Sequence, residues 1–186
     1  MSALTELSLY QRVLGESFEQ LAPALRSFHA QLAGARARGE LEVRRGRGPL
    51  ARLAAWTIRA PAEGPAVPVE LAVEVHGERE RWVRHFAGRP MITRQWAAQG
   101  LLVEAVSLTQ LHFELRVEQG GMRFVQRRCV LLGLLPLPGW LAPRIEVEAR
   151  ATEQGAGAWH ISVEIHLPVI GLVTSYAGQM VIEVGS

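Results

Sequence analysis

Apolar and polar residues alternate along the chain from Val67 onward. Between residues 67 and 76, Val or Leu fills every second position, with Pro, Glu, Ala or His between them. A period of two is typical of a strand that buries one face. Comparable strands are predicted at 79–86, 91–98, 101–107, 110–118, 122–133, 144–153, 158–167 and 171–183. Because most turns between them are short, the pattern predicts an antiparallel meander of roughly eight strands.

The first 66 residues have a different pattern. Residues 5–33 predict helix in two pieces, with an apolar stripe at helical spacing formed by Leu21, Leu25, Phe28 and Leu32. Residues 35–66 are rich in Arg and Gly and predict a connection with a short strand and a short helix. We therefore predict a single domain, 1–186, made of a helical N-terminus (1–34), this connection (35–66) and an antiparallel sheet (67–186).

These elements indicate an α+β fold that is mainly β. No alternation of strands and long helices is present, so a parallel Rossmann-type sheet is not expected. A meander of this length either curves over the N-terminal helices as an open sheet or closes into a barrel. Both arrangements can enclose an internal cavity that binds a small molecule.

Composition excludes several kinds of chemistry. All 20 basic residues are Arg, all 18 acidic residues are Glu, and the chain has no Lys, Asp or Asn. It therefore lacks a phosphate-loop Lys, a Schiff-base Lys and a Ser-His-Asp triad, although a Ser-His-Glu triad remains formally open. The net charge of +2 does not indicate nucleic-acid binding.

Cysteine usage and apolar runs bear on the compartment. The single Cys129 excludes an intrachain disulfide and a Cys-based metal site. The N-terminus does not resemble a signal peptide, and the longest apolar run, 131–142, contains prolines and is too short to cross a bilayer. We expect a cytoplasmic protein without stable membrane insertion.

The strand 79–86 carries the most informative side chains. Trp82, Arg84 and Phe86 share one face, so Arg84 points inward if the two aromatic residues do. A buried guanidinium needs a carboxylate or an anionic ligand. Glu104, within an apolar strand, is a candidate partner or base, and Tyr176 could supply a hydroxyl from the last strand. The alternatives are a purely structural Arg–Glu pair, an aromatic cluster that faces solvent, and an outward Glu104 on an edge strand.

Other polar patterns have simpler interpretations. His160, Ser162, Glu164 and His166 could ligate a metal, but they alternate with an apolar face and are expected to face water. We therefore predict no metal and no cofactor. The apolar loop 134–143 could cap a cavity, form a homodimer interface, touch a membrane surface or, as we slightly favour, fold back on the core.

A set of short segments extends over nearly the whole chain: 9–15, His29, Gly46 with Gly48, Trp82 with Arg84 and Phe86, 136–138, 168–171, and Tyr176 with Gly178. Together they resemble a bacterial family known as Domain of Unknown Function 4166. Its members occur alone or appended to reductase-like domains of the saccharopine dehydrogenase or short-chain type. The resemblance implies no established activity, but it suggests a reductase as a partner or genetic neighbour and draws attention to Trp82, Arg84 and Tyr176.

The residues favour a module that binds a small apolar or amphipathic ligand, with Arg84 and Tyr176 fixing an acidic head group. They leave open whether the protein is an enzyme. In an isomerase- or cyclase-like alternative, Glu104, His85 or His29 would act as acid or base beside Arg84. In a third alternative, an accessory domain would dock on a reductase through residues 134–143.

Overall fold

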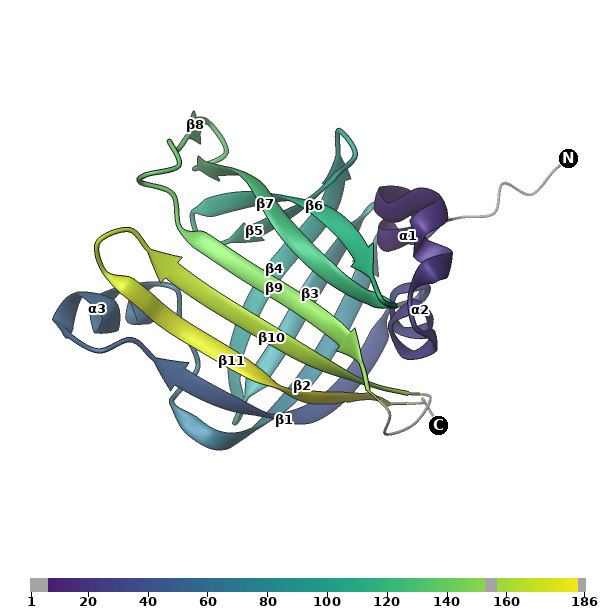
Figure 1. The fold of residues 1–186 in the computed structure, drawn as a ribbon, viewed down its shortest axis with the longest axis horizontal. Coiled ribbons are helices and arrows are strands. Elements are labelled where there is room, and N and C mark those ends of the chain that lie inside the picture. Colours follow the sequence, from purple (N-terminus) through teal and green to yellow (C-terminus); the bar gives the residue numbers. More distant parts are fainter. Residues whose placement is uncertain (1–6, 153–156, 184–186) are drawn as a thin grey trace, which may run out of the picture.

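A computed structural model describes residues 7–152 and 157–183. Within these residues, ten antiparallel strands close into a barrel (Figure 1). The strands are β1 (Ala35–Arg45), β2 (Gly64–His76), β3 (Arg79–Phe86), β4 (Arg89–Ala98), β5 (Leu101–Val106), β6 (Thr109–Glu118), β7 (Gly121–Leu131), β9 (Arg144–Ala151), β10 (Ala158–Leu167) and β11 (Gly171–Ile182). The mainly β class, the meander and the curved sheet are confirmed.

Closure uses two contacts between strands that are distant in sequence. β11 pairs with β1, and β7 pairs with both β6 and β9, so no edge of the ten-stranded sheet is left free in the described part of the chain. The short β8 (Leu135–Pro136) adds only to the end of β7. The fold is therefore a closed barrel rather than an open sheet, and all inward side chains share one interior.

Short turns explain the regular meander. Ala87–Gly88, Gln99–Gly100 and Gln119–Gly120 are two-residue connections, and both residues of each pair have a positive φ. That geometry suits the right-handed twist of neighbouring strands and favours Gly at the second position. The β2–β3 pairing runs from Val69 opposite Phe86 to His76 opposite Arg79, as the alternation predicts.

The connection 35–66 differs from the prediction. β1 extends over eleven residues instead of a short strand near Leu41 and Val43, and β2 begins at Gly64. The sheet thus starts at Ala35 rather than at residue 67. The alternation in β1 escapes detection because its inward positions include the small Ala37 and Gly39, whereas Arg and Glu occupy the outward positions.

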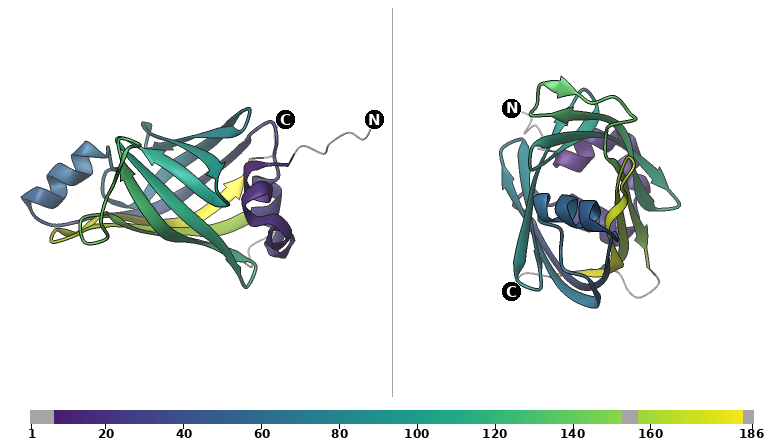
Figure 2. Two further views of the ribbon diagram at one scale, coloured as in Figure 1. Left: turned by 90° about the horizontal axis from the view of Figure 1, so that it is seen from above. Right: turned by 90° about the vertical axis from the view of Figure 1, so that its left-hand side faces the viewer.

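Helices close one end of the barrel (Figures 1 and 2). α1 (Leu9–Leu14), the 3-10 helix η1 (Gly15–Gln20) and α2 (Pro23–His29) precede β1 and form what we call the helical plug. Ser8 and Gln11 cap α1 reciprocally, and the Ala22 amide donates to the Gly120 carbonyl. Of the predicted stripe, Leu21, Leu25 and Phe28 are buried, but Leu32 lies beyond the end of α2 and is exposed.

α3 (Pro49–Thr57) lies at the opposite end, between β1 and β2. Figure 2 (right) shows it across the end of the barrel, with the helical plug behind it. Ala51 and Ala55 are its buried residues, so it approaches the barrel through small side chains. None of the helices in the described residues has the length and apolar character needed to cross a bilayer.

Candidate functional site

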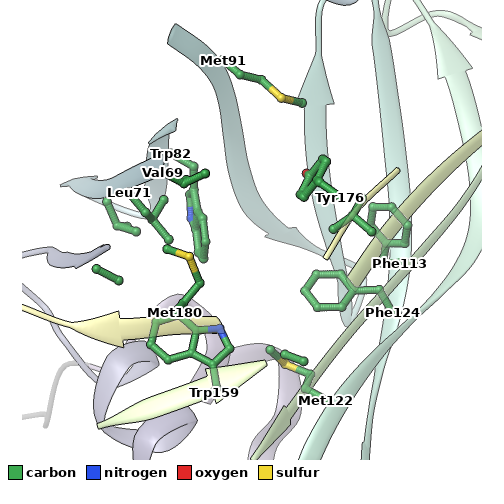
Figure 3. Close-up of a cluster of buried hydrophobic side chains, with 14 of the residues drawn as sticks. Val69, Leu71, Trp82, Met91, Phe113, Met122, Phe124, Trp159, Tyr176 and Met180 are labelled. Carbon is green, nitrogen blue, oxygen red and sulfur yellow. The ribbon is translucent and has the colours of Figure 1, made fainter. Parts of the chain in front are cut away.

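The barrel encloses a cavity of about 400 Å³. Most of its lining is aliphatic or aromatic, and Figure 3 shows Trp82, Trp159, Met180 and Tyr176 among the side chains gathered there. Tyr10, Phe28 and His29 of the helical plug form its floor, and residues of α3 and of the segment after β8 line the other end. Its volume and apolar character are those of a small-molecule site.

Arg84 reaches into this cavity from β3. Its Nη1 donates a hydrogen bond of 2.9 Å to the Thr93 hydroxyl, and its guanidinium carbon lies 5.0 Å from the centre of the Trp82 ring. Its Nη2 is 3.6 Å from Oε1 of Glu104. The side chains of Arg84 and Glu104 are only 16% and 11% exposed, so this ion pair is largely desolvated.

Strand register brings these groups together. Trp82 faces Thr93 across the β3–β4 pair, and Glu104 faces Gln95 across the β4–β5 pair. Side chains at alternate positions of three consecutive strands therefore converge on Arg84 from one wall of the barrel. The alternative in which Glu104 faces outward on an edge strand is wrong, because β5 lies between β4 and β6 and Glu104 is buried.

Arg84 keeps hydrogen-bonding capacity for a ligand. A guanidinium has five N–H donors, and within the described residues the hydrogen bond to Thr93 is the one that it makes. No side-chain nitrogen or oxygen in this part of the chain is both fully buried and without a partner. The unused N–H groups therefore remain accessible, and the cavity is the space that they adjoin.

Tyr176 lines the same cavity from β11. Its ring packs edge-on against Phe86, with centroids 5.2 Å apart. Its hydroxyl makes no hydrogen bond to Arg84 or Glu104, contrary to the expectation from the sequence. Burial raises the pKa of Tyr176, so the hydroxyl stays protonated and can donate to a ligand.

All five predicted site residues, Trp82, Arg84, Phe86, Glu104 and Tyr176, line this one cavity. Sequence reasoning missed three polar residues buried beside them, which are Glu80, Thr93 and Gln95. Each lies an even number of residues along its strand from an inward aromatic or apolar residue, and therefore points to the same face. That spacing is the signal that could have identified them. Their polar character suggested solvent exposure instead.

A second polar cluster lies between the cavity and the helical plug. The Tyr10 hydroxyl donates to Oε1 of Gln95 at 2.9 Å, and the indole N–H of Trp82 donates to Oε2 of Glu80 at 2.9 Å. Burial raises the pKa of Tyr10 well above its ordinary value and raises that of Glu80 as well. The hydrogen bond to Glu80 helps to hold the Trp82 ring over which the Arg84 guanidinium lies.

The histidines considered as acids or bases do not meet Arg84. His29 packs between Tyr10 and Trp82, at centroid distances of 3.8 and 5.8 Å, and burial lowers its pKa to about 3. It is therefore a neutral core residue at physiological pH. His85 follows Arg84 on β3, so its side chain points to the other face of the sheet. There it lines a separate surface groove together with Glu70.

The outward strand faces carry no metal cluster. His160 and Glu164 are exposed, and Trp159, Val163 and Ile165 are buried on the opposite face, as the alternation predicts. In residues 7–152 and 157–183, no three His, Cys, Asp or Glu side chains are placed to hold a metal ion.

The apolar loop 134–143 does not fold back on the core as a whole. Leu134 and Trp140 are 87% and 77% exposed. Leu137, Leu141 and Pro143 line the cavity, so the loop forms part of its wall.

Comparison with known proteins places the chain in a family and adds no activity. No curated protein and no solved structure matches it. One family model matches the chain from residue 21 onward. The matched region therefore contains the barrel wall with Arg84, Glu104 and Tyr176, but it does not contain Tyr10 of the helical plug. The model of the family described as "Domain of unknown function (DUF4166)" matches residues 21–180, and the chain therefore belongs to this family.

Proposed function

We propose that the barrel is a binding module for a small amphipathic molecule with an apolar body and an acidic head group. The observation that carries the proposal is Arg84, a guanidinium with unused donors inside a mostly apolar cavity of about 400 Å³. An apolar body would gain about 25 cal/mol for each Å² of surface removed from water. The head group would determine orientation, because Arg84, Glu104 and Tyr176 are polar groups in a lining that is mostly aliphatic or aromatic.

The Arg84–Glu104 pair favours a carboxylic acid as the head group. The unused N–H groups of Arg84 can bind a carboxyl oxygen, and the Glu104 carboxylate can accept a proton-bearing oxygen. Two ionised carboxylates beside one guanidinium would repel each other, so one proton is expected to be held between them when the acid binds. Binding should therefore take up a proton and strengthen as the pH falls towards the ordinary range of carboxyl groups.

The first test identifies what the protein carries. Native mass spectrometry after bacterial expression should detect a bound amphipathic molecule, and denaturation should release it for identification. Calorimetric titration with decanoic acid and with decanol then compares an acidic probe with a neutral one of the same chain length. We expect the acid to bind more tightly, with proton uptake measured in buffers of different ionisation enthalpy.

Arg84→Met separates the head-group contact from the apolar contact. A hydrogen bond to a charged group contributes about 1.5–3 kcal/mol, which corresponds to about tenfold to hundredfold in affinity. The variant should lose that much affinity for decanoic acid and keep its affinity for decanol. Arg94→Met is the matched control, because Arg94 is exposed on the neighbouring strand β4. Unchanged binding of decanoic acid by Arg84→Met would refute the assignment.

One contact favours a second function, an acid–base enzyme. Glu104 and Arg84 converge within 3.6 Å in a largely desolvated cavity, where a carboxylate can act as a base beside a cation. If so, Glu104→Gln should bind the copurified molecule but no longer convert it. Docking on a reductase through residues 134–143 stays a prediction, which a pull-down with the Trp140→Ser variant would check.

A further inference from the structure

Exposed apolar side chains gather around the end of the barrel opposite the helical plug. They belong to four segments: α3, the β5–β6 turn, residues 132–141 and the β10–β11 turn. We call them the apolar rim, with Leu53, Trp56, Leu108, Leu134, Trp140 and Val169 as principal members. Each of these six is at least 59% exposed, although isolated soluble domains rarely leave so many large apolar side chains in water at one end.

Packing within the fold does not explain the rim. α3 turns its small residues Ala51 and Ala55 toward the barrel, while Leu53 and Trp56 project outward. In Figures 1 and 2, α3, β8 and the β10–β11 turn all lie at the same end. The outward apolar face of α3 is therefore available for a contact outside the chain.

The rim and the cavity share a wall. α3 contributes Ala54 and Ile58 to the cavity lining, and the segment that carries Trp140 contributes Leu137 and Leu141. The segments that separate the cavity from solvent are thus the same segments that expose apolar side chains. A surface docked on the rim would lie directly against the end of the cavity.

Charge around the rim is basic. The connections at this end (46–63, 87–88, 107–108, 132–143 and 168–170) contain Arg47, Arg52 and Arg59 but a single carboxylate, Glu63. All three Arg side chains are exposed and pair with no carboxylate of the described residues. Carboxylates are more frequent at the plug end, where Glu16, Glu19 and Glu78 are exposed. The rim is therefore complementary to an apolar surface with negative charge at its boundary.

We propose that the apolar rim docks on the surface of an anionic lipid bilayer. Leu and Trp side chains would enter the boundary between head groups and acyl chains, and the neighbouring Arg side chains would contact lipid phosphates. Four separate segments placed around an opening suit a fluid surface, which adapts to each of them. The docked orientation would let an apolar molecule pass between bilayer and cavity without crossing water. The docking proposal depends on the apolar rim alone. The passage of a molecule between bilayer and cavity also rests on the proposed ligand-binding function.

Vesicle flotation tests the docking directly. The full chain is mixed with vesicles of phosphatidylcholine alone and with vesicles that also contain phosphatidylglycerol, and the fraction that floats gives a partition coefficient. We expect binding to be stronger on the vesicles with phosphatidylglycerol. Trp56→Ser and Trp140→Ser should each lower partitioning about tenfold, because about 1.4 kcal/mol of apolar burial is lost in each.

Matched variants separate the rim from the rest of the surface. Leu32→Ser removes an apolar side chain that is 46% exposed at the plug end, and it should leave partitioning unchanged. Arg52→Gln should lower partitioning about fivefold on anionic vesicles alone, since one Arg near such a surface contributes about 1 kcal/mol. Arg94→Gln, on the outside of β4, should have no such effect.

The outcomes distinguish docking from ligand binding. Arg84→Met should float like the wild type, so a failure to bind decanoic acid and a failure to bind vesicles are independent results. Absence of wild-type flotation on both vesicle types overturns the proposal, as does flotation that the Trp variants do not change. A wild-type dimer that Trp56→Ser or Trp140→Ser dissociates, measured by light scattering, would instead assign the rim to a contact between two copies of this chain.

Discussion

The Arg84–Glu104 pair makes a sharp prediction about stability. Replacing Glu104 by Leu leaves a guanidinium in the cavity without its carboxylate, and Arg does not lose its proton in proteins. At 3.6 Å between Nη2 and Oε1, the lost attraction is about 4–5 kcal/mol for an effective dielectric constant of about 20. Because both side chains retain some exposure and water can enter the cavity, we expect Glu104→Leu to lower the free energy of unfolding by about 3 kcal/mol.

The reciprocal variant should cost less. Arg84→Met leaves Glu104 without a cation, but a carboxyl group, unlike a guanidinium, has a neutral form available to it. Its cost is therefore expected to be about 1–2 kcal/mol. The double variant Arg84→Met with Glu104→Leu removes both charges and should unfold within about 1 kcal/mol of the wild type, as replaced buried ion pairs often do.

Urea denaturation followed by tryptophan fluorescence measures all four members of this cycle. Glu148→Leu is the matched control, because Glu148 pairs with Arg150 at 2.7 Å on the outside of β9, with side chains 37% and 67% exposed. The control should cost less than about 1 kcal/mol despite the shorter distance, since exposed pairs contribute little. If the costs of the two single variants simply add in the double variant, the two charges are not coupled and the reasoning fails.

Three further predictions concern other parts of the barrel. Tyr10→Phe removes the hydrogen bond to the buried Gln95 and should lower the free energy of unfolding by about 1–3 kcal/mol. Tyr176→Phe should be nearly neutral, because the Tyr176 hydroxyl makes no such bond to Arg84 or Glu104, and thermal unfolding compares the two variants. Gly39→Ala places a methyl group against the Gln179 carbonyl and the Met180 sulfur and should lower the free energy of unfolding by about 1–3 kcal/mol. In the control Gly139→Ala the methyl group meets open space, so equal urea midpoints for the two variants would contradict this packing. Burial raises the pKa of Glu80 above its ordinary value of 4.5, so the wild type loses stability as the pH rises from that value through the raised pKa. Glu80→Gln should therefore gain stability relative to the wild type as the pH rises above 4.5, and a difference in urea stability that does not change with pH would count against the assignment.

The alternation of apolar residues was sufficient to predict most of the sheet. β3 and β10 have the predicted bounds, because Trp82 and Phe86 mark the inward face of β3 and large apolar side chains fill the inward face of β10. β1 could not be predicted at full length, since a side chain at Gly39 would clash with the β11 backbone at Gln179 and only Gly avoids that clash. The need for a small residue arises from closure of the barrel, and closure is a long-range property that local periodicity does not contain.

The sequence also predicted the placement of several residues of the candidate site. Strand parity placed Trp82, Arg84 and Phe86 inside, because an aromatic residue on each side of Arg84 determines its face. Strand parity could not predict that Tyr176 packs against Phe86. The two residues come from β11 and β3, and they meet because β11, β1, β2 and β3 follow one another around the barrel. Polar residues such as Gln95 were missed because burial with a specific partner, here Tyr10, depends on the helical plug and not on the strand itself.

The two ends of the barrel are held in different ways, and this bears on how a ligand would reach Arg84. At the plug end, the Tyr10–Gln95 hydrogen bond, the Ala22–Gly120 backbone hydrogen bond and the stacked rings of His29 and Trp82 fix the helices to the wall. At the rim, α3 packs through Ala51 and Ala55, and Arg45 holds the chain after it by donating to the Ala60 and Pro61 carbonyls. Small side chains bury little area, so displacing α3 costs much less than displacing the plug. A ligand is therefore expected to enter the cavity past the rim rather than past the helical plug.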